Sequence, residues 1–289
     1  MDRDAALDTY RYLRGGIPVM LIMLGVAIVI EVARSRTVLT SVSAYYFTSV
    51  HAVFVGTVCV MGALLIVYRG VKPTEDILLN LAGTLAFVVA FVPTTRPSPD
   101  VPIGAVPVST VVANVWALAT ALVLARIASW LMYRRTHTAP DLGPIARAAM
   151  WLQRTVFTIG IVTLAVAPRW FVTNAHGIAA VTLFAAIIAT VFLTAFVADK
   201  GMVNSANPGL YQRVYRGIAV AMVLTLGAAV VVHYTLSEFS HVVIVVEVVL
   251  LAEFFAYWAV QTVEKWNPPA DSADRQSCTP DAERVLRAL

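Results

Sequence analysis

Eight long apolar stretches divide this 289-residue chain, and they limit its fold more than any other feature. The hydrocarbon core of a bilayer is about 30 Å thick, so a helix that crosses it needs roughly 20 apolar residues. The stretches lie at about 17–34, 45–69, 74–92, 106–133, 149–167, 175–198, 211–235 and 239–264. Such spans must be helical, because lipid offers no partner for backbone N–H and C=O groups. The sequence therefore predicts an all-α, polytopic transmembrane helical bundle with about eight spans over residues 1–266.

The composition excludes an ordinary soluble domain. Hydrophobic residues make up 59% of the chain and charged residues 13%, with a mean hydropathy of +0.78, whereas soluble domains carry roughly 25% charged residues. The formal charge of +4 comes mostly from basic residues in short segments between apolar stretches. We therefore interpret this charge as a signal of orientation among membrane lipids, and we predict no nucleic-acid partner.

The basic residues fall almost entirely on one side of an eight-span arrangement. If the N-terminus lies inside, only four of the 21 Lys and Arg residues lie outside: Arg34, Arg36, Arg96 and Arg169. Positive charge in short loops stays cytoplasmic, so both ends of the chain are predicted to be cytoplasmic. Arginine far outnumbers lysine, and alanine and valine are frequent, which is typical of a GC-rich bacterial genome and favours a bacterial cytoplasmic membrane.

Three segments have distinctive compositions. Small residues recur at every fourth position of the fourth stretch, from Ser109 to Ser129, and such residues let another helix approach closely. We expect this helix to sit centrally, with a contact between two copies as the alternative. Prolines between Pro93 and Pro107 predict an extended outer loop. Residues 267–289 are polar and predict a cytoplasmic tail that includes a short helix.

Acidic residues in the last apolar stretch are the strongest indication of function. An ionisable side chain in the hydrocarbon region costs several kcal/mol unless it is paired or hydrated. Glu253 lies near the middle of this stretch, and Glu247 lies about two turns nearer the outer face. Helical spacing places four residues on one stripe: Glu253, Tyr257, Gln261 and Glu264. These residues predict a binding site for a small solute or cation around Glu253, and a structural glutamate is the alternative.

Four histidines map to the predicted outer side of the membrane: His51, His176, His233 and His241. A histidine in the first turn of a helix is favoured in its neutral form, which is the form that binds metal. Three histidines with an open fourth position suit catalytic zinc. The alternative function is therefore an intramembrane hydrolase or lipid-modifying enzyme with a divalent metal as its cofactor. Interfacial side chains that bond headgroups, water or loops, or that sense pH, are the other interpretations.

A further acidic pair opens the third stretch on the inner side. Thr74 is a candidate N-cap, and Glu75 and Asp76 suit the positive end of the helix dipole. Asn80 lies on the same face as Asp76. The alternative to capping is a cytoplasmic vestibule for an ion or solute, formed by Asp76 and Asn80.

Missing motifs narrow the choice of function. The chain has no Walker A sequence, GxSxG, CxxC or GxGxxG, and its three lysines lie at inner ends. The sequence therefore favours neither an ATP-driven pump on this chain alone nor a retinal Schiff base. A transporter or binding protein is the leading hypothesis, and a scaffold or sensor that acts through loops and tail is a further one. The motif Thr-x-x-His occurs twice, ending at His51 and at His176. This recurrence indicates a possible four-plus-four helix repeat.

Overall fold

The structure, a computed structural model, describes residues 3–70, 72–98, 101–136, 142–196, 208–235, 241–264 and 266. These residues form helices and no strand, so the predicted all-α class is confirmed for them. The elements are α1 (Arg3–Ser35), the 3-10 helix η1 (Ser43–Phe47), α2 (His51–Val67), α3 (Pro73–Phe91), α4 (Val108–Thr136), α5 (Pro144–Val166), α6 (Pro168–Phe196), α7 (Pro208–Thr235) and α8 (Val242–Glu264). Within the described residues, six helices are long and apolar enough to cross a membrane, namely α1, α3, α4, α5, α6 and α8. α2 is shorter, at 17 residues.

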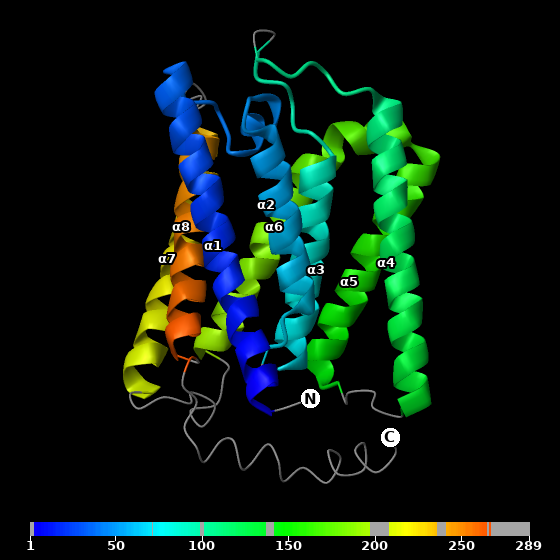
Figure 1. The fold of residues 1–289 in the computed structure, drawn as a ribbon, viewed down its shortest axis with the longest axis vertical. Helices are drawn as coiled ribbons and strands as arrows, with labels where there is room; N and C mark the ends of the chain where they lie inside the picture. The colour runs from blue at the N-terminus through cyan, green and yellow to red at the C-terminus, as the bar shows by residue number, and fades with distance from the viewer. Residues whose placement is uncertain are drawn as a thin grey trace.

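The α-helices run broadly along the long axis of the molecule and alternate in direction (Figure 1). α1 begins and α8 ends at the same end, which we call the lower end. η1 and the loop that follows α3 lie at the opposite, upper end (Figure 1). This alternation is the arrangement that a chain crossing a bilayer repeatedly requires.

Six helices form a closed ring of packed neighbours, in the order α1, α2, α3, α6, α7, α8 and back to α1. The most extensive contacts in this ring join α3 to α6 and α2 to α3. α5 packs against α3 and α6, and α4 makes sparser contacts with the same two helices. α4 and α5 therefore flank the ring, and α4 stands at the edge of the molecule in Figure 1.

The predicted central position of the fourth helix is wrong. Every member of the small-residue ladder is exposed: Ser109, Ala113, Ala117, Ala121, Ala125 and Ser129. Val111 and Val115 are the buried residues of α4. Each of these valines follows a residue of the ladder by two positions. Two positions correspond to a rotation of about 200° around a helix, so the valines lie on the face opposite the ladder. Small residues permit close approach but do not compel it, and the larger valines occupy the contact with the rest of the fold. Contact between two copies stays a prediction.

α2 and α3 pack closely against each other at a pair of glycines. A Cβ atom added at Gly62 would lie 2.7 Å from the Gly83 carbonyl oxygen, and one added at Gly83 would lie 2.5 Å from the Gly62 carbonyl oxygen. Backbone atoms cannot yield as the end of a side chain can. The two glycines therefore set the separation of these two helices.

The upper end of the ring is covered by η1 and by the proline-containing loop. All five residues of η1 are buried, and burial raises the pKa of the Tyr45 phenol, which keeps it protonated. The Ile103 N–H donates a hydrogen bond to the Phe47 carbonyl over 3.1 Å. The described parts of the loop contain no helix, as predicted. The loop therefore covers η1 as well as connecting α3 to α4.

Several helix boundaries differ from the predicted spans, and the largest differences are at the starts of α1 and α6. α1 begins at Arg3 instead of near residue 17, and α6 begins at Pro168, directly after Ala167 ends α5. Hydropathy marks the part of a helix that matches the hydrocarbon core, whereas the helix itself continues through polar residues. The predicted tail at residues 267–289, with its short helix, lies outside the described residues.

Candidate binding site

A cavity of about 80 Å³ lies between α1, α2, α3, α6 and α8, below η1. Its walls are almost entirely apolar and include Leu24, Phe54, Leu65 and Phe184. The stretch of α2 from Phe54 to Leu65 is about 16 Å long at 1.5 Å per residue, so the cavity is elongated along the bundle. About 10–15 Å³ holds the centre of one water molecule, so this space accommodates a group larger than water.

Glu247 is the one ionisable group in the cavity wall. Its Oε2 atom accepts a hydrogen bond of 2.6 Å from the backbone N–H of Val42, the residue that precedes η1. Its Oε1 atom makes no hydrogen bond within the described part of the chain. One oxygen therefore fixes the carboxylate at the upper end of the cavity, while the other remains available to a ligand.

Glu253 does not line this cavity. Its Oε1 atom accepts a hydrogen bond of 2.8 Å from the Thr225 hydroxyl of α7. Its Oε2 atom is buried and makes no hydrogen bond. Six residues of helix separate Glu253 from Glu247, which turns the two side chains to different neighbours. The structure therefore does not bring Glu253 to the cavity, and we place the candidate site at Glu247.

A buried polar network lies at the lower end of the ring. It begins at Arg14 of α1, which is 3% exposed, and ends at Glu75 of α3, which is 5% exposed. Arg14 Nη2 donates to the Tyr68 hydroxyl over 2.9 Å, and this hydroxyl donates to Gln261 Oε1 over 3.1 Å. Gln261 Nε2 donates to the Tyr257 hydroxyl over 3.0 Å.

The same network continues from Tyr257 to the carboxylate. The Tyr257 and Thr194 hydroxyl oxygens are 3.2 Å apart, and the Thr194 hydroxyl donates to Glu75 Oε1 over 3.2 Å. The Thr194 hydroxyl also lies 3.0 Å from the Thr190 carbonyl, so its single proton has two acceptors, and either hydroxyl can donate in the contact between Thr194 and Tyr257. The hydrogen bonds from Arg14 to Tyr257 all point away from the cation, and Thr194 joins Tyr257 to Glu75. The network therefore links two buried opposite charges that make no direct ion pair with each other.

The sequence indicates only part of this network. Tyr257, Gln261 and Glu264 are all buried, as their common stripe on α8 suggests, and Glu264 accepts a hydrogen bond from the Tyr215 hydroxyl of α7. Arg14 and Glu75 lie at the ends of predicted spans, where a charge usually marks orientation or a helix cap. No local signal separates a buried terminal charge from an exposed one.

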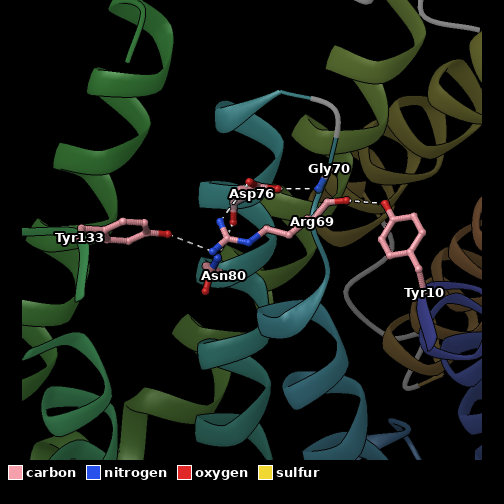
Figure 2. Close-up of polar contacts among 6 residues, drawn as sticks. All are labelled: Tyr10, Arg69, Gly70, Asp76, Asn80 and Tyr133. Atoms are coloured by element: carbon pink, nitrogen blue, oxygen red, sulfur yellow. Dashed lines mark hydrogen bonds and ion pairs between the residues drawn. The ribbon is translucent and has the colours of Figure 1, made fainter. Parts of the chain in front are cut away.

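Asp76 and Asn80 form no vestibule of their own in the described residues. Figure 2 shows Arg69 between Asp76 and Tyr133, with its carbonyl facing Tyr10. Asp76 accepts hydrogen bonds from Arg69 Nη1 over 3.3 Å and from the Gly70 N–H over 2.5 Å. Asn80 donates to the Asp76 carbonyl over 2.8 Å within α3.

Arg69 connects three helices through these contacts. Its carbonyl accepts a hydrogen bond of 2.6 Å from Tyr10 of α1, and its Nη2 atom donates to Tyr133 of α4 over 3.1 Å (Figure 2). The hydrogen bond with Tyr133 and the neighbouring Asp76 carboxylate raise the pKa of Arg69, so it stays charged. Asp76 therefore orders the turn between α2 and α3.

Replacing Asp76 with alanine is expected to lower the free energy of unfolding by about 1–2 kcal/mol, the usual cost of losing a side chain that caps backbone N–H groups. Thermal unfolding of the purified protein in detergent measures this change. Asn80→Ala is the matched control and should have a smaller effect, because the hydrogen bond from the Asn80 side chain to the Asp76 carbonyl stays within α3. Equal effects would argue against an ordering role for Asp76.

The histidines contact separate parts of the backbone. The shorter contacts join His51 Nδ1 to the Tyr46 carbonyl and His176 Nδ1 to the Val92 carbonyl, each over 2.6 Å. His241 Nε2 lies 3.3 Å from the Val38 carbonyl. The His233 side chain lies outside the described residues.

Within the described residues, no group of three or more His, Cys, Asp and Glu side chains is arranged to hold a metal ion. The structure therefore does not bring the described histidines together as the metal hypothesis requires. His51 begins α2, whereas His176 lies two turns into α6. The two Thr-x-x-His motifs thus occupy different places in their helices, and the four-plus-four repeat stays a prediction.

The chain matches no protein-family model, no curated protein and no solved structure.

Proposed function

We propose that this protein is an eight-span membrane protein that binds a small apolar solute with a cationic group in the cavity beside Glu247, as a transporter or a binding protein. The observation that carries the proposal is a single ionisable group in an otherwise apolar cavity inside the ring. A carboxylate in such surroundings is stabilised by a cation or a hydrogen-bond donor. The apolar walls accept the rest of the solute.

The proposed topology has both ends of the chain in the cytoplasm of a bacterial cell. Its support is the alternation of the helices (Figure 1) and the six helices of membrane-crossing length among the described residues. The distribution of basic residues toward the lower end also supports it. The cavity and Glu247 then lie nearer the outer face of the membrane.

Protonated n-hexylamine, with its neutral analogue 1-hexanol, tests the binding site. The amine is expected to raise the melting temperature of the purified protein more than the alcohol does, because binding to the folded state stabilises it. Glu247→Gln should weaken amine binding about tenfold or more, since a hydrogen bond to a charged group contributes about 1.5–3 kcal/mol. Binding of the alcohol should change little.

Glu253→Gln is the matched control on the same helix. It removes a carboxylate that bonds Thr225 and does not line the cavity, so its amine binding should equal that of the unaltered protein. The proposal fails if Glu247→Gln binds hexylamine as tightly as the unaltered protein, or if Glu253→Gln alone abolishes binding.

A further inference from the structure

We propose that Arg14 forms a second binding site, selective for an oxyanion such as a phosphate group, at the lower end of the ring. This site is separate from the cavity beside Glu247, and neither proposal depends on the other. The feature that indicates it is a buried guanidinium whose neighbours supply too few acceptors.

Arg14 is 3% exposed, and two of its three nitrogens, Nε and Nη1, are buried and make no hydrogen bond. The third nitrogen, Nη2, donates to the Tyr10 hydroxyl over 2.6 Å and to the Tyr68 hydroxyl over 2.9 Å. Both partners are neutral. A guanidinium presents its donors in a planar fork that matches the oxygens of a carboxylate or a phosphate.

No carboxylate of the described residues forms an ion pair with Arg14. The ion pairs found there join Arg11 to Asp8 and Arg69 to Asp76, and Glu75 is reached only through the chain of hydrogen bonds. The positive charge is therefore dispersed within the protein and not neutralised by a direct contact. A buried cation in this condition favours binding of an anion.

Aromatic rings shape the surroundings of the guanidinium. Its central carbon lies 4.2 Å from the centroid of the Tyr10 ring and 5.2 Å from that of the Tyr68 ring, and the two rings are stacked with centroids 5.8 Å apart. Tyr68 is buried, whereas Tyr10 is partly exposed. We place the entry of the anion at Tyr10, whose rotation would break its hydrogen bonds to Arg14 Nη2 and to the Arg69 carbonyl.

The lower end of the bundle also suits a phosphate group by its position. It carries the basic residues that we assign to the cytoplasmic side, where the phosphates of phospholipids lie. The ligand chemistry is the same for a lipid headgroup and for a free phosphate, so the experiment has to distinguish these two sources.

The test compares inorganic phosphate, dioctanoyl phosphatidylglycerol and the uncharged dioctanoylglycerol, each titrated into the purified full-length protein in a neutral detergent. The melting temperature should rise with one or both phosphate compounds and not with dioctanoylglycerol. A rise with inorganic phosphate identifies a site open to free anions. A rise with the phospholipid alone identifies a lipid headgroup site.

Three variants connect the effect to Arg14. Arg14→Met should abolish the rise, and Arg14→Lys should weaken binding about tenfold, because lysine keeps the charge but lacks the planar fork. Arg11→Met removes an arginine of the same helix that is already paired with Asp8, so it should keep the full effect. If Arg14→Met does not fold, the weaker binding expected of Arg14→Lys tests the role of the guanidinium by itself.

Two results would overturn the proposal. The first is the absence of any rise with both phosphate compounds in the unaltered protein. The second is a rise in Arg14→Lys at the same ligand concentration as in the unaltered protein, since this would show that the guanidinium fork does not bind the anion.

Discussion

Glu75→Gln is expected to lower the free energy of unfolding by about 3–5 kcal/mol, as found when one member of a buried charge pair is removed. Glutamine keeps the shape of the side chain and an oxygen that accepts the Thr194 hydroxyl bond. The change therefore removes the negative charge while an oxygen remains for the hydrogen bond from Thr194. Without the carboxylate, the chain of hydrogen bonds that starts at Arg14 no longer ends at an anion.

A double-mutant cycle with Arg14→Met separates this explanation from a local effect in α3. Each single variant leaves one buried charge without its counterpart, whereas the double variant leaves neither. The loss in free energy of unfolding in the double variant should therefore be smaller, by about 1–3 kcal/mol, than the sum of the losses in the two single variants. Thermal or denaturant unfolding in detergent gives the three free energies.

The exposed pair of Arg11 and Asp8 is the control cycle. Its nitrogen and oxygen are 2.7 Å apart in a direct ion pair, yet the Asp8 side chain is 57% exposed. Exposed pairs contribute about 0.2–1 kcal/mol. Additive effects of the Arg14 and Glu75 changes would show that the hydrogen-bonded chain does not couple the two charges.

Gly83→Ala is expected to destabilise the protein by about 1–3 kcal/mol, the usual cost of adding atoms to a packed interior. The new Cβ atom would lie 2.5 Å from the Gly62 carbonyl oxygen, so α2 and α3 must move apart. These two helices both line the cavity. We therefore expect weaker binding of n-hexylamine together with the lower melting temperature.

Two other glycine variants test whether the close contact between α2 and α3 causes this loss of stability. Gly62→Ala meets the same contact from the opposite helix and should have a similar effect, with its Cβ atom 2.7 Å from the Gly83 carbonyl oxygen. Gly56 lies on α2 with nothing within 4 Å of an added Cβ atom. Gly56→Ala should therefore be neutral or slightly stabilising, because alanine favours a helix by about 1 kcal/mol over glycine. A similar loss at Gly56 would refute the close-approach explanation.

Arg14 shows why the candidate sites were only partly predictable. The sequence places it just before an apolar stretch, where a basic residue indicates orientation. The structure continues α1 through this position and packs it against Tyr68, which follows α2. Burial of Arg14 thus depends on a residue 54 positions away, and no periodicity within α1 encodes that contact.

Glu247 and Glu253 illustrate the same limit on a single helix. Both are acidic residues in one apolar stretch, and depth in the membrane alone made Glu253 the better candidate. The contacts in the structure favour Glu247 instead. Glu247 accepts a hydrogen bond from the residue that precedes η1 and lines the cavity, whereas Glu253 accepts a hydrogen bond from Thr225 of α7. The angle between two side chains follows from helical geometry, but the surface that each one meets depends on helix packing.

The sequence alone was sufficient for the all-helical class and for most of the long apolar helices of the described chain. Hydropathy and helix length are local properties, and each segment satisfies its own backbone hydrogen bonds. Tertiary packing decided that α4 lies outside the ring, that a glycine pair sets the spacing of α2 and α3, and that Arg14 and Glu75 are joined across the bundle. These features require contacts between residues distant in sequence, and an apolar helix carries little information about which of its faces will find a partner, because lipid and protein interior are both apolar.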